Sequence, residues 1–401
     1  MERELTAQQQ DYMSRMETIF EQKLKPYLEE WDAMGGAQVA VRMPEQWVDF
    51  WTALRDNDFT GLRIPKKYGG PELDLYTVGL LIEHACYISR SGSWSQLFTQ
   101  NDCPTEMLRQ VGTEDQRERY LGRMREGGMA AALSTEPLPG AGLDPRATQC
   151  VATRDGDHYI LNGQKWFGAF NDRGPFGKNF SYAIVRTGTS GETEELSMFL
   201  IDNDNPGLVL GREGNQVGIR IQPRWESRLE NCRVHKDDCL GGVGNGFRTM
   251  MVFTTMVNAE FSPFSVGIAR AAIDYTADYL KNRVVFGKPV SDNQGIYFEL
   301  ADLAINTEAG RLLCFEALTT YDRDPLAARR LATASKVFNG LNGINVTNKC
   351  FLMFGGRSFE KGEGHPLERL VRDALASTLG RGFNLERRYF AETLLQKKLP
   401  L

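Results

Sequence analysis

Glu260 is a carboxylate in the kind of apolar sequence that suits a general base. With Phe264 and Ile268 it repeats at four-residue intervals, so on a helix the three side chains share one face. Burial on such a face raises the pKa of a carboxyl group, which favours proton transfer near neutrality. The nearby Ser262-Pro263 pair is typical of a helix start and gives an alternative, in which Glu260 precedes the helix and is structural or solvated.

The sequence gives little support for the common metal, nucleotide-binding and hydrolase motifs. Cys232, His235 and Cys239 form a compact Cys/His group, but their spacing is unlike that of zinc sites, so we predict no metal. The glycine-rich residues 241–247 do not match G-x-G-x-x-G, which favours a domain hinge over a nucleotide loop. The sequence contains no Walker, HExxH or GxSxG motif.

Composition and charge restrict the partners. The chain has 401 residues and a net charge of −5, with no run of Lys and Arg, so we expect no nucleic acid partner. Apolar runs stay well short of the roughly 20 residues of a membrane span, and the N-terminus has no apolar signal core. The seven cysteines are spread out, as is usual for reduced thiols. We therefore expect a cytoplasmic protein without a membrane partner.

Helical periodicity dominates the first part of the chain. Apolar residues recur at helical spacing among charged neighbours at Met16, Ile19, Phe20, Leu24 and Tyr27. Segments 45–58 and 114–127 have the pattern of further amphipathic helices, whereas segment 63–74 carries the Pro and Gly of a loop. These patterns predict an N-terminal helical domain over residues 1–128.

The period changes near residue 130 to short apolar runs separated by turn residues. Asp155-Gly156 and Asn162-Gly163 are typical hairpin dipeptides, so we predict that they join three antiparallel strands. Further strands are predicted at 182–186, 196–201, 207–211 and 227–234. The sequence thus predicts a middle antiparallel β-domain over residues 129–240.

Helical spacing returns in the last part of the chain, for example at Ile268, Ala272, Ile273, Ala277 and Leu280. We therefore predict a C-terminal helical bundle over residues 241–401. This order of helices, strands and helices indicates an α+β enzyme whose site lies where the domains meet.

Three segments together resemble the acyl-CoA dehydrogenase family: TEPLPGAGLD at 135–144, LNGQKWF at 161–167 and NRVVFGKPVSDNQ at 282–294. The family fold is a helical domain, a β-domain and a four-helix bundle, as the periodicity predicts. The resemblance implies an FAD-dependent oxidoreductase that acts on a CoA or carrier-bound acyl thioester. It also implies a homotetramer or homodimer with FAD between subunits, and an electron-transfer flavoprotein or oxygen as a further partner.

The resemblance also implies which residues hold FAD: Thr135, Gly142, Trp166, Gly168, Arg283, Phe286, Gln294, Gly355, Gly356 and Gly382. The chemistry of the side chains agrees. An indole such as Trp166 can pack on the flavin ring, the hydroxyl of Thr135 can meet its polar edge, and the guanidinium of Arg283 suits a pyrophosphate. If each residue is considered by itself, the alternative to FAD binding is core packing for Trp166 and a surface ion pair for Arg283.

The sequence departs from the family where a catalytic base is expected. Alignment of RDALASTLGRGF places Arg381 at the family's glutamate, and arginine cannot accept a proton near neutral pH. At a second family position for the base this chain has Val257, followed by Asn258 instead of arginine. We therefore expect non-standard catalytic residues, with Glu260 as the candidate base and Arg381 near an anionic group. Gly168 replaces a threonine that lies near the flavin in the family.

These departures leave two further functions open. The first is a flavin-dependent oxygenase or oxidase of the same fold, because reaction of the reduced flavin with oxygen does not need that glutamate. The second is a half-active subunit that needs a homologous partner chain to complete its site.

Overall fold

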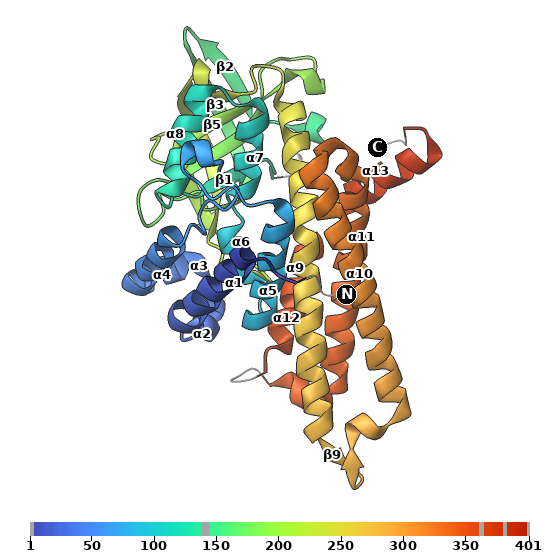
Figure 1. Ribbon diagram of the computed structural model, residues 1–401. Helices are drawn as coiled ribbons and strands as arrows, with labels where there is room; N and C mark the ends of the chain where they lie inside the picture. The colour runs from blue at the N-terminus through green and yellow to red at the C-terminus, as the bar shows by residue number, and fades with distance from the viewer. Residues whose placement is uncertain (1–3, 138–143, 361–364, 380–382, 399–401) are drawn as a thin grey trace.

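The computed structural model describes residues 4–137, 144–360, 365–379 and 383–398. A helical N-terminal part and a β-sheet lie along one side of a bundle of long helices (Figure 1). The predicted fold class is confirmed: helices, then a β-domain, then helices.

The N-terminal part is helical because its segments carry strong start signals. Thr6 and Thr113 each form a capping box with the glutamine three residues later, Gln9 and Gln116. Pro44 is the first residue of another helix, α4, where the backbone N–H that proline lacks would have no partner within the helix. The helices are α1 (Ala7–Ile19), α2 (Leu28–Met34), α3 (Gly36–Arg42), α4 (Pro44–Asp56), α5 (Leu75–Ser89), α6 (Ser93–Phe98), α7 (Asp102–Val111) and α8 (Glu114–Arg125).

The β-domain is a mixed sheet in the strand order β6-β7-β3-β2-β4-β5-β8. Its strands are β1 (Ala130–Leu133), β2 (Val151–Asp155), β3 (His158–Ala169), β4 (Phe180–Arg186), β5 (Leu196–Asp202), β6 (Leu208–Glu213), β7 (Arg224–His235) and β8 (Cys239–Leu240). The four strands predicted after residue 180 are all present. Most neighbours are antiparallel, but β1 pairs in parallel with β4, as β2 does at one position.

The Asp155-Gly156 hairpin is confirmed, but the predicted turn at Asn162-Gly163 is wrong. Both residues lie inside β3, where the register with β7 shifts between Leu161 and Gly163. No turn forms because β7 pairs with β3 on both sides of Asn162, and Asn162 faces a bulge in β7 formed by Glu230 and Asn231. Gly163 has a φ of 141°, and a Cβ there would lie 2.4 Å from the Cys150 sulfur.

Both faces of the sheet are covered at the central strands β4 and β5. Alternate residues of β5 point to opposite sides: Met198 and Leu200 pack against the helices α7 and α8, whereas Phe199 and Ile201 enter a second apolar core. Every residue of β4 is buried, because apolar side chains cover this strand on both faces. This part of the sheet therefore lies between two apolar cores.

The C-terminal part consists of α9 (Gly246–Asn282), α10 (Gln294–Arg323), α11 (Pro325–Met353), α12 (Leu367–Leu379) and α13 (Phe383–Leu395). A small hairpin, β9 (Val284–Val285) with β10 (Lys288–Pro289), joins α9 to α10 at the end of the bundle away from the sheet (Figure 1).

Helix α9 starts at Gly246, so the alternative in which Ser262-Pro263 begins a helix is wrong. Pro263 lies inside the helix, although it cannot donate to the carbonyl one turn earlier. The surrounding contacts offset that loss. Ser262 and Ser335 share a hydrogen bond of 2.5 Å, and Phe264 is fully buried against Gly92, which has no room for a Cβ. Glu260 is therefore a helical residue.

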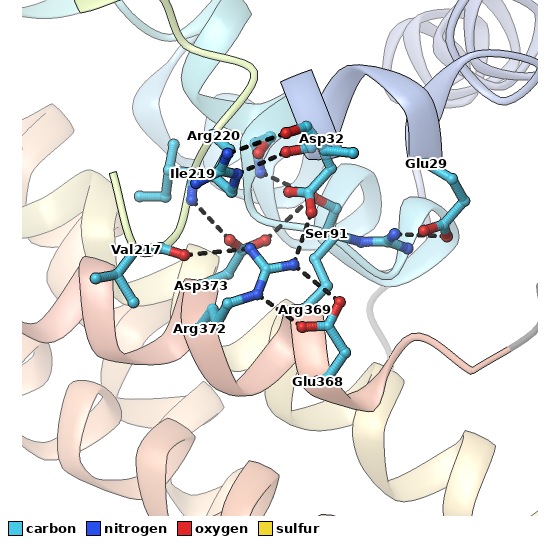
Figure 2. A network of polar contacts seen from close by, with 12 residues as sticks. Glu29, Asp32, Ser91, Val217, Ile219, Arg220, Glu368, Arg369, Arg372 and Asp373 are labelled. Atoms are coloured by element: carbon cyan, nitrogen blue, oxygen red, sulfur yellow. Dashed lines mark hydrogen bonds and ion pairs between the residues drawn. The ribbon is translucent and has the colours of Figure 1, made fainter. Parts of the chain in front are cut away.

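The buried carboxylate of Asp373, in α12, joins the three parts of the molecule (Figure 2). It accepts hydrogen bonds from the backbone N–H groups of Gly92 and Ile219, both at 2.7 Å, and from the Ser91 hydroxyl at 3.1 Å. Ser91 and Gly92 follow α5, whereas Ile219 lies in the loop before β7. One side chain thus satisfies donors from the helical part and from the β-domain.

Two arginines of α12 extend this network (Figure 2). Arg372 donates to Asp32 of α2 at 2.6 Å and to the Val217 carbonyl at 3.2 Å. Arg369, itself buried, donates to Glu29 at 2.6 Å. We call Asp373, Arg372, Arg369 and their partners the α12 network. This network fixes α12 against the helical N-terminal part and against the β-domain. Position 381 comes shortly after α12 in the sequence.

Removing the Asp373 carboxylate should strongly destabilise the fold. Asp373→Ala leaves two buried backbone N–H groups without an acceptor, so we expect the free energy of unfolding to fall by about 2–4 kcal/mol. Urea denaturation followed by circular dichroism measures this. Asp278→Ala, an exposed aspartate of α9 paired with Lys281, is the matched control and should change little. Equal effects of the two substitutions would contradict the role of the α12 network.

Candidate functional site

Thr135 and Trp166 lie next to each other on the β-domain. The backbone N–H of Trp166, in β3, donates to the Thr135 carbonyl at 2.8 Å. Both residues are half-buried. Their backbones thus lie side by side, and we call this region of the β-domain the Thr135–Trp166 surface. An indole and a hydroxyl group suit a ligand with an apolar ring and a polar edge.

A buried ion pair holds this surface in place. Lys165 and Glu136, the chain neighbours of Trp166 and Thr135, are both buried and pair at 2.6 Å. Glu136 also accepts from the Gln149 N–H at 2.6 Å. Burial alone would raise the pKa of Glu136, but the Lys165 ammonium and the backbone donor outweigh it and hold the pKa below its usual range. The charged pair ties the Thr135 segment to β3.

Packing leaves no space for a side chain at Gly168. A Cβ at this position would lie 2.7 Å from Cδ2 of Leu133 and 3.0 Å from Nδ2 of Asn171, both side chains being fully or almost fully buried. Asn171 is itself held by donation to the Trp225 carbonyl at 2.9 Å. The sequence revealed that a side chain is missing at Gly168, but not that its neighbours leave no space for one.

Arg283 and Phe286 flank β9, and the β9–β10 hairpin lies at the far end of the bundle from β3, the strand of Trp166 (Figure 1). Arg283 is exposed at the end of α9, and Gln294, the first residue of α10, is also exposed. Phe286 and Gly287 form the two-residue turn between β9 and β10, with φ values of 53° and 82°. A bulky residue rarely adopts such a φ, and here it leaves the phenyl ring fully exposed.

Gly355 and Gly356 belong to this same end of the molecule. They follow α11, and their neighbour Phe354 stacks on Tyr279 of α9 with ring centroids 3.9 Å apart. Both glycines are exposed and face open space. The predicted FAD residues therefore form two separate groups within one chain, one on the β-domain and one at the hairpin end. Gly142, Gly382 and Arg381 lie outside the described residues.

Glu260 is buried in a cluster of acidic groups that the sequence did not reveal. Its Oε2 lies 3.5 Å from the sulfur of Cys103, and its carboxyl group lies beside that of Asp102 at the start of α7. Asp102 is almost fully buried, and this desolvation raises its pKa to about 7, against the opposing effect of Arg63. Nothing in the TQNDCP sequence distinguishes Asp102 from an ordinary helix-start residue.

Arg63 balances the negative charge of this region. It is buried and pairs with Glu106 at 3.4 Å and with Asp322 of α10 at 3.3 Å. Near neutral pH Asp102 changes between its protonated and ionised forms, because burial raises its pKa to about 7. This carboxyl group, next to Glu260, can therefore hold or release a proton in the pH range of most enzymes.

The Asp102 pKa should appear as a pH dependence of stability. The folded protein binds this proton more tightly than the unfolded chain, so its stabilisation is complete at low pH and is lost as the pH rises from the ordinary value of 3.8 to about 7. Asp102→Asn should remove a slope of up to about 1.4 kcal/mol per pH unit. Urea midpoints across that range measure it, with the exposed Asp115→Asn as control. An unchanged slope would contradict the raised pKa.

Each of the three parts of the chain matches a profile of one protein family. Profiles of the acyl-CoA dehydrogenase N-terminal, middle and C-terminal domains match residues 6–128, 131–232 and 244–388. The chain belongs to the acyl-CoA dehydrogenase family, and the family resemblance of the sequence is confirmed.

Individual proteins agree with this assignment. The 3-(aryl)acrylate reductase of Clostridium sporogenes is 30% identical over 358 residues, which cover 88% of this chain and 89% of the relative. A probable acyl-CoA dehydrogenase of Mycobacterium tuberculosis is 29% identical over 98% of this chain and 96% of its own length. The solved butyryl-CoA dehydrogenase of Megasphaera elsdenii superposes with a TM-score of 0.88 at 26% identity, covering 98% of this chain and 100% of that one.

Proteins of this family are FAD-dependent oxidoreductases, so the chain is a flavoenzyme and FAD is its cofactor, as predicted. The Thr135–Trp166 surface fits such a group. The described residues contain no set of three His, Cys, Asp or Glu side chains that could hold a metal ion, and Cys232 lies in the β-domain core. Within the described part of the chain, no helix has the length and apolar content needed to cross a membrane.

Proposed function

We propose that this chain uses FAD to oxidise or reduce the Cα–Cβ bond of an acyl thioester carried on CoA or on a carrier protein. The Thr135–Trp166 surface, fixed by the buried Lys165–Glu136 pair, is the observation that carries the proposal. The relatives support it, because the names 3-(aryl)acrylate reductase and butyryl-CoA dehydrogenase both describe chemistry at a Cα–Cβ bond.

In this proposal the β-domain residues orient the flavin. The indole of Trp166 packs on the ring and the Thr135 hydroxyl meets its polar edge. When bound, FAD supplies the hydride transfer to or from the substrate β-carbon. The chain itself must then hold the thioester and handle one proton at the α-carbon.

Glu260 is the proposed proton-handling residue. It takes the α-proton when the bond is oxidised and returns it when the bond is reduced, which balances the hydride. Glu260 is buried beside Asp102, whose pKa burial raises to about 7, so a second group that exchanges protons near neutrality lies next to the proposed base. Arg381, at the family's glutamate position, is proposed to bind an anionic group of the substrate, because a guanidinium is a donor and not a base.

We further propose that FAD is held between two copies of the chain. The β9–β10 hairpin lies at the opposite end of the molecule from β3, which carries Trp166 (Figure 1). The hairpin end includes Arg283, Phe286, Gln294, Gly355 and Gly356, so one extended ligand would meet both groups most simply across a subunit interface. An apolar stripe on α10 supports an interface. Its members, Phe298, Ile305 and Leu312, follow at seven-residue intervals and are more than half exposed.

An acyl thioester should reduce the bound flavin without oxygen. We expect butyryl-CoA or 3-phenylpropionyl-CoA to bleach the visible flavin absorbance under anaerobic conditions, and Glu260→Gln to slow the bleaching about 100-fold or more. Stopped-flow absorbance measures both rates. Glu316→Gln, an exposed glutamate of α10, is the matched control and should bleach at the rate of the unaltered protein.

Each other outcome has a definite meaning. Unchanged bleaching by Glu260→Gln would show that the base lies elsewhere. No bleaching by either thioester, together with rapid reoxidation of chemically reduced flavin in air, would overturn the thioester proposal in favour of an oxygenase or oxidase. Flavin reduction that needs a co-purified homologous chain would favour the half-active subunit.

Arg283→Ala should weaken FAD binding. Loss of a charged, two-pronged contact with a phosphate should raise the Kd for FAD about tenfold or more. Fluorescence titration of the FAD-free protein measures this, and Lys281→Ala, an exposed lysine at the end of α9, is the control. Co-production of Arg283→Ala and Trp166→Ala chains should restore part of the FAD content, because a mixed pair contains one intact site. Failure of this rescue would contradict a shared site.

A further inference from the structure

The indole of Trp166 is held by a charged group on the neighbouring strand. Its Nε1–H donates to Oε1 of Glu226, in β7, at 2.9 Å. The same oxygen accepts from Nε and Nη2 of Arg212, in β6, at 3.1 and 2.9 Å. Because β6, β7 and β3 are neighbours in the sheet, the three side chains form a chain of contacts across three strands.

The backbone explains why Trp166 meets Glu226. β3 pairs with β7 at Lys165 and Ser227 and again at Gly168 and Trp225, so two residues of β3 face one residue of β7 between these pairs. At such a bulge, successive side chains no longer alternate strictly between the two faces of the sheet. The bulge places Trp166 beside Glu226, while Lys165 remains buried in its ion pair with Glu136.

The contact with Glu226 restricts the ring itself. An indole has two side-chain torsions and one N–H donor, so a bond from that donor to a carboxylate fixes both the ring plane and its direction. Arg212 holds the carboxylate from the other side, and the Glu226 side chain is 21% exposed, against 60% for Arg212. The acceptor is thus partly shielded from water, whereas its counter-ion is on the surface.

We propose that Glu226 is a positioning residue for the flavin: through the Trp166 N–H it sets the orientation in which the indole packs on the ring, and Arg212 holds Glu226 in place. This inference rests on the proposed function, in which Trp166 contacts FAD. A purely structural role, in which the bond only links β3 to β7, makes a different prediction, because it would alter stability without altering the bound flavin.

Substitutions at Glu226 distinguish these roles. Glu226→Leu removes the acceptor, whereas Glu226→Gln keeps a carbonyl oxygen for the indole. We expect Glu226→Leu to change the visible circular dichroism of the bound flavin and to raise the Kd for FAD about three- to tenfold, and Glu226→Gln to restore most of both. Glu230→Leu, an exposed glutamate of the same strand that pairs with Arg228, is the matched control and should leave both unchanged.

A double substitution tests whether Glu226 acts through the indole. Trp166→Phe should alter the flavin dichroism, and adding Glu226→Leu to it should cause no further change. Additive effects, or a Glu226→Leu protein with a lower unfolding midpoint but an unaltered flavin spectrum, would overturn the inference. If Trp166→Phe itself leaves the spectrum and the Kd unchanged, the placement of Trp166 in the proposed function fails instead.

Discussion

The buried carboxylate of Asp373 is the constraint on which the arrangement of the whole molecule depends. It satisfies backbone donors from the helical part and from the β-domain, while its own helix belongs to the bundle. A buried acceptor that belongs to one part and takes donors from the other two permits one arrangement only, because any shift leaves a donor unsatisfied in an apolar interior. The contact between Asp102 and Glu260, which also joins two parts, depends on this fixed arrangement.

Other buried charges follow the same principle. Glu136 and Lys165 pair inside the β-domain, and Lys336 of α11 pairs with Glu386 in the first turn of α13 at 2.5 Å. Buried ion pairs add little net stability, since desolvation offsets most of their attraction, but breaking one is costly. They therefore act mainly to specify position. Here they fix the segment around Thr135 and the start of the helix that follows position 381.

The departures from the family pattern are accommodated by their surroundings. The space beside Gly168 is filled by Leu133 and Asn171. Asn258, at a position where the family has arginine, lies in a buried polar contact with Thr333 and Lys336, at 3.5 and 3.4 Å. Restoring single family residues would thus meet neighbours that do not fit them.

The sequence by itself determined the order of helices, strands and helices, the capped helix starts and the Asp155-Gly156 hairpin, because these depend on periodicity and on neighbours in the chain. It also determined that position 381 carries no base, since that follows from residue type. Only the tertiary structure decided that Asn162-Gly163 lies inside a strand opposite a bulge, that α9 continues through Pro263, and that Glu260 meets Asp102. Each of these is settled by a partner distant in the sequence, and the energy of packing and buried hydrogen bonds at such contacts exceeds the local preferences that a sequence displays.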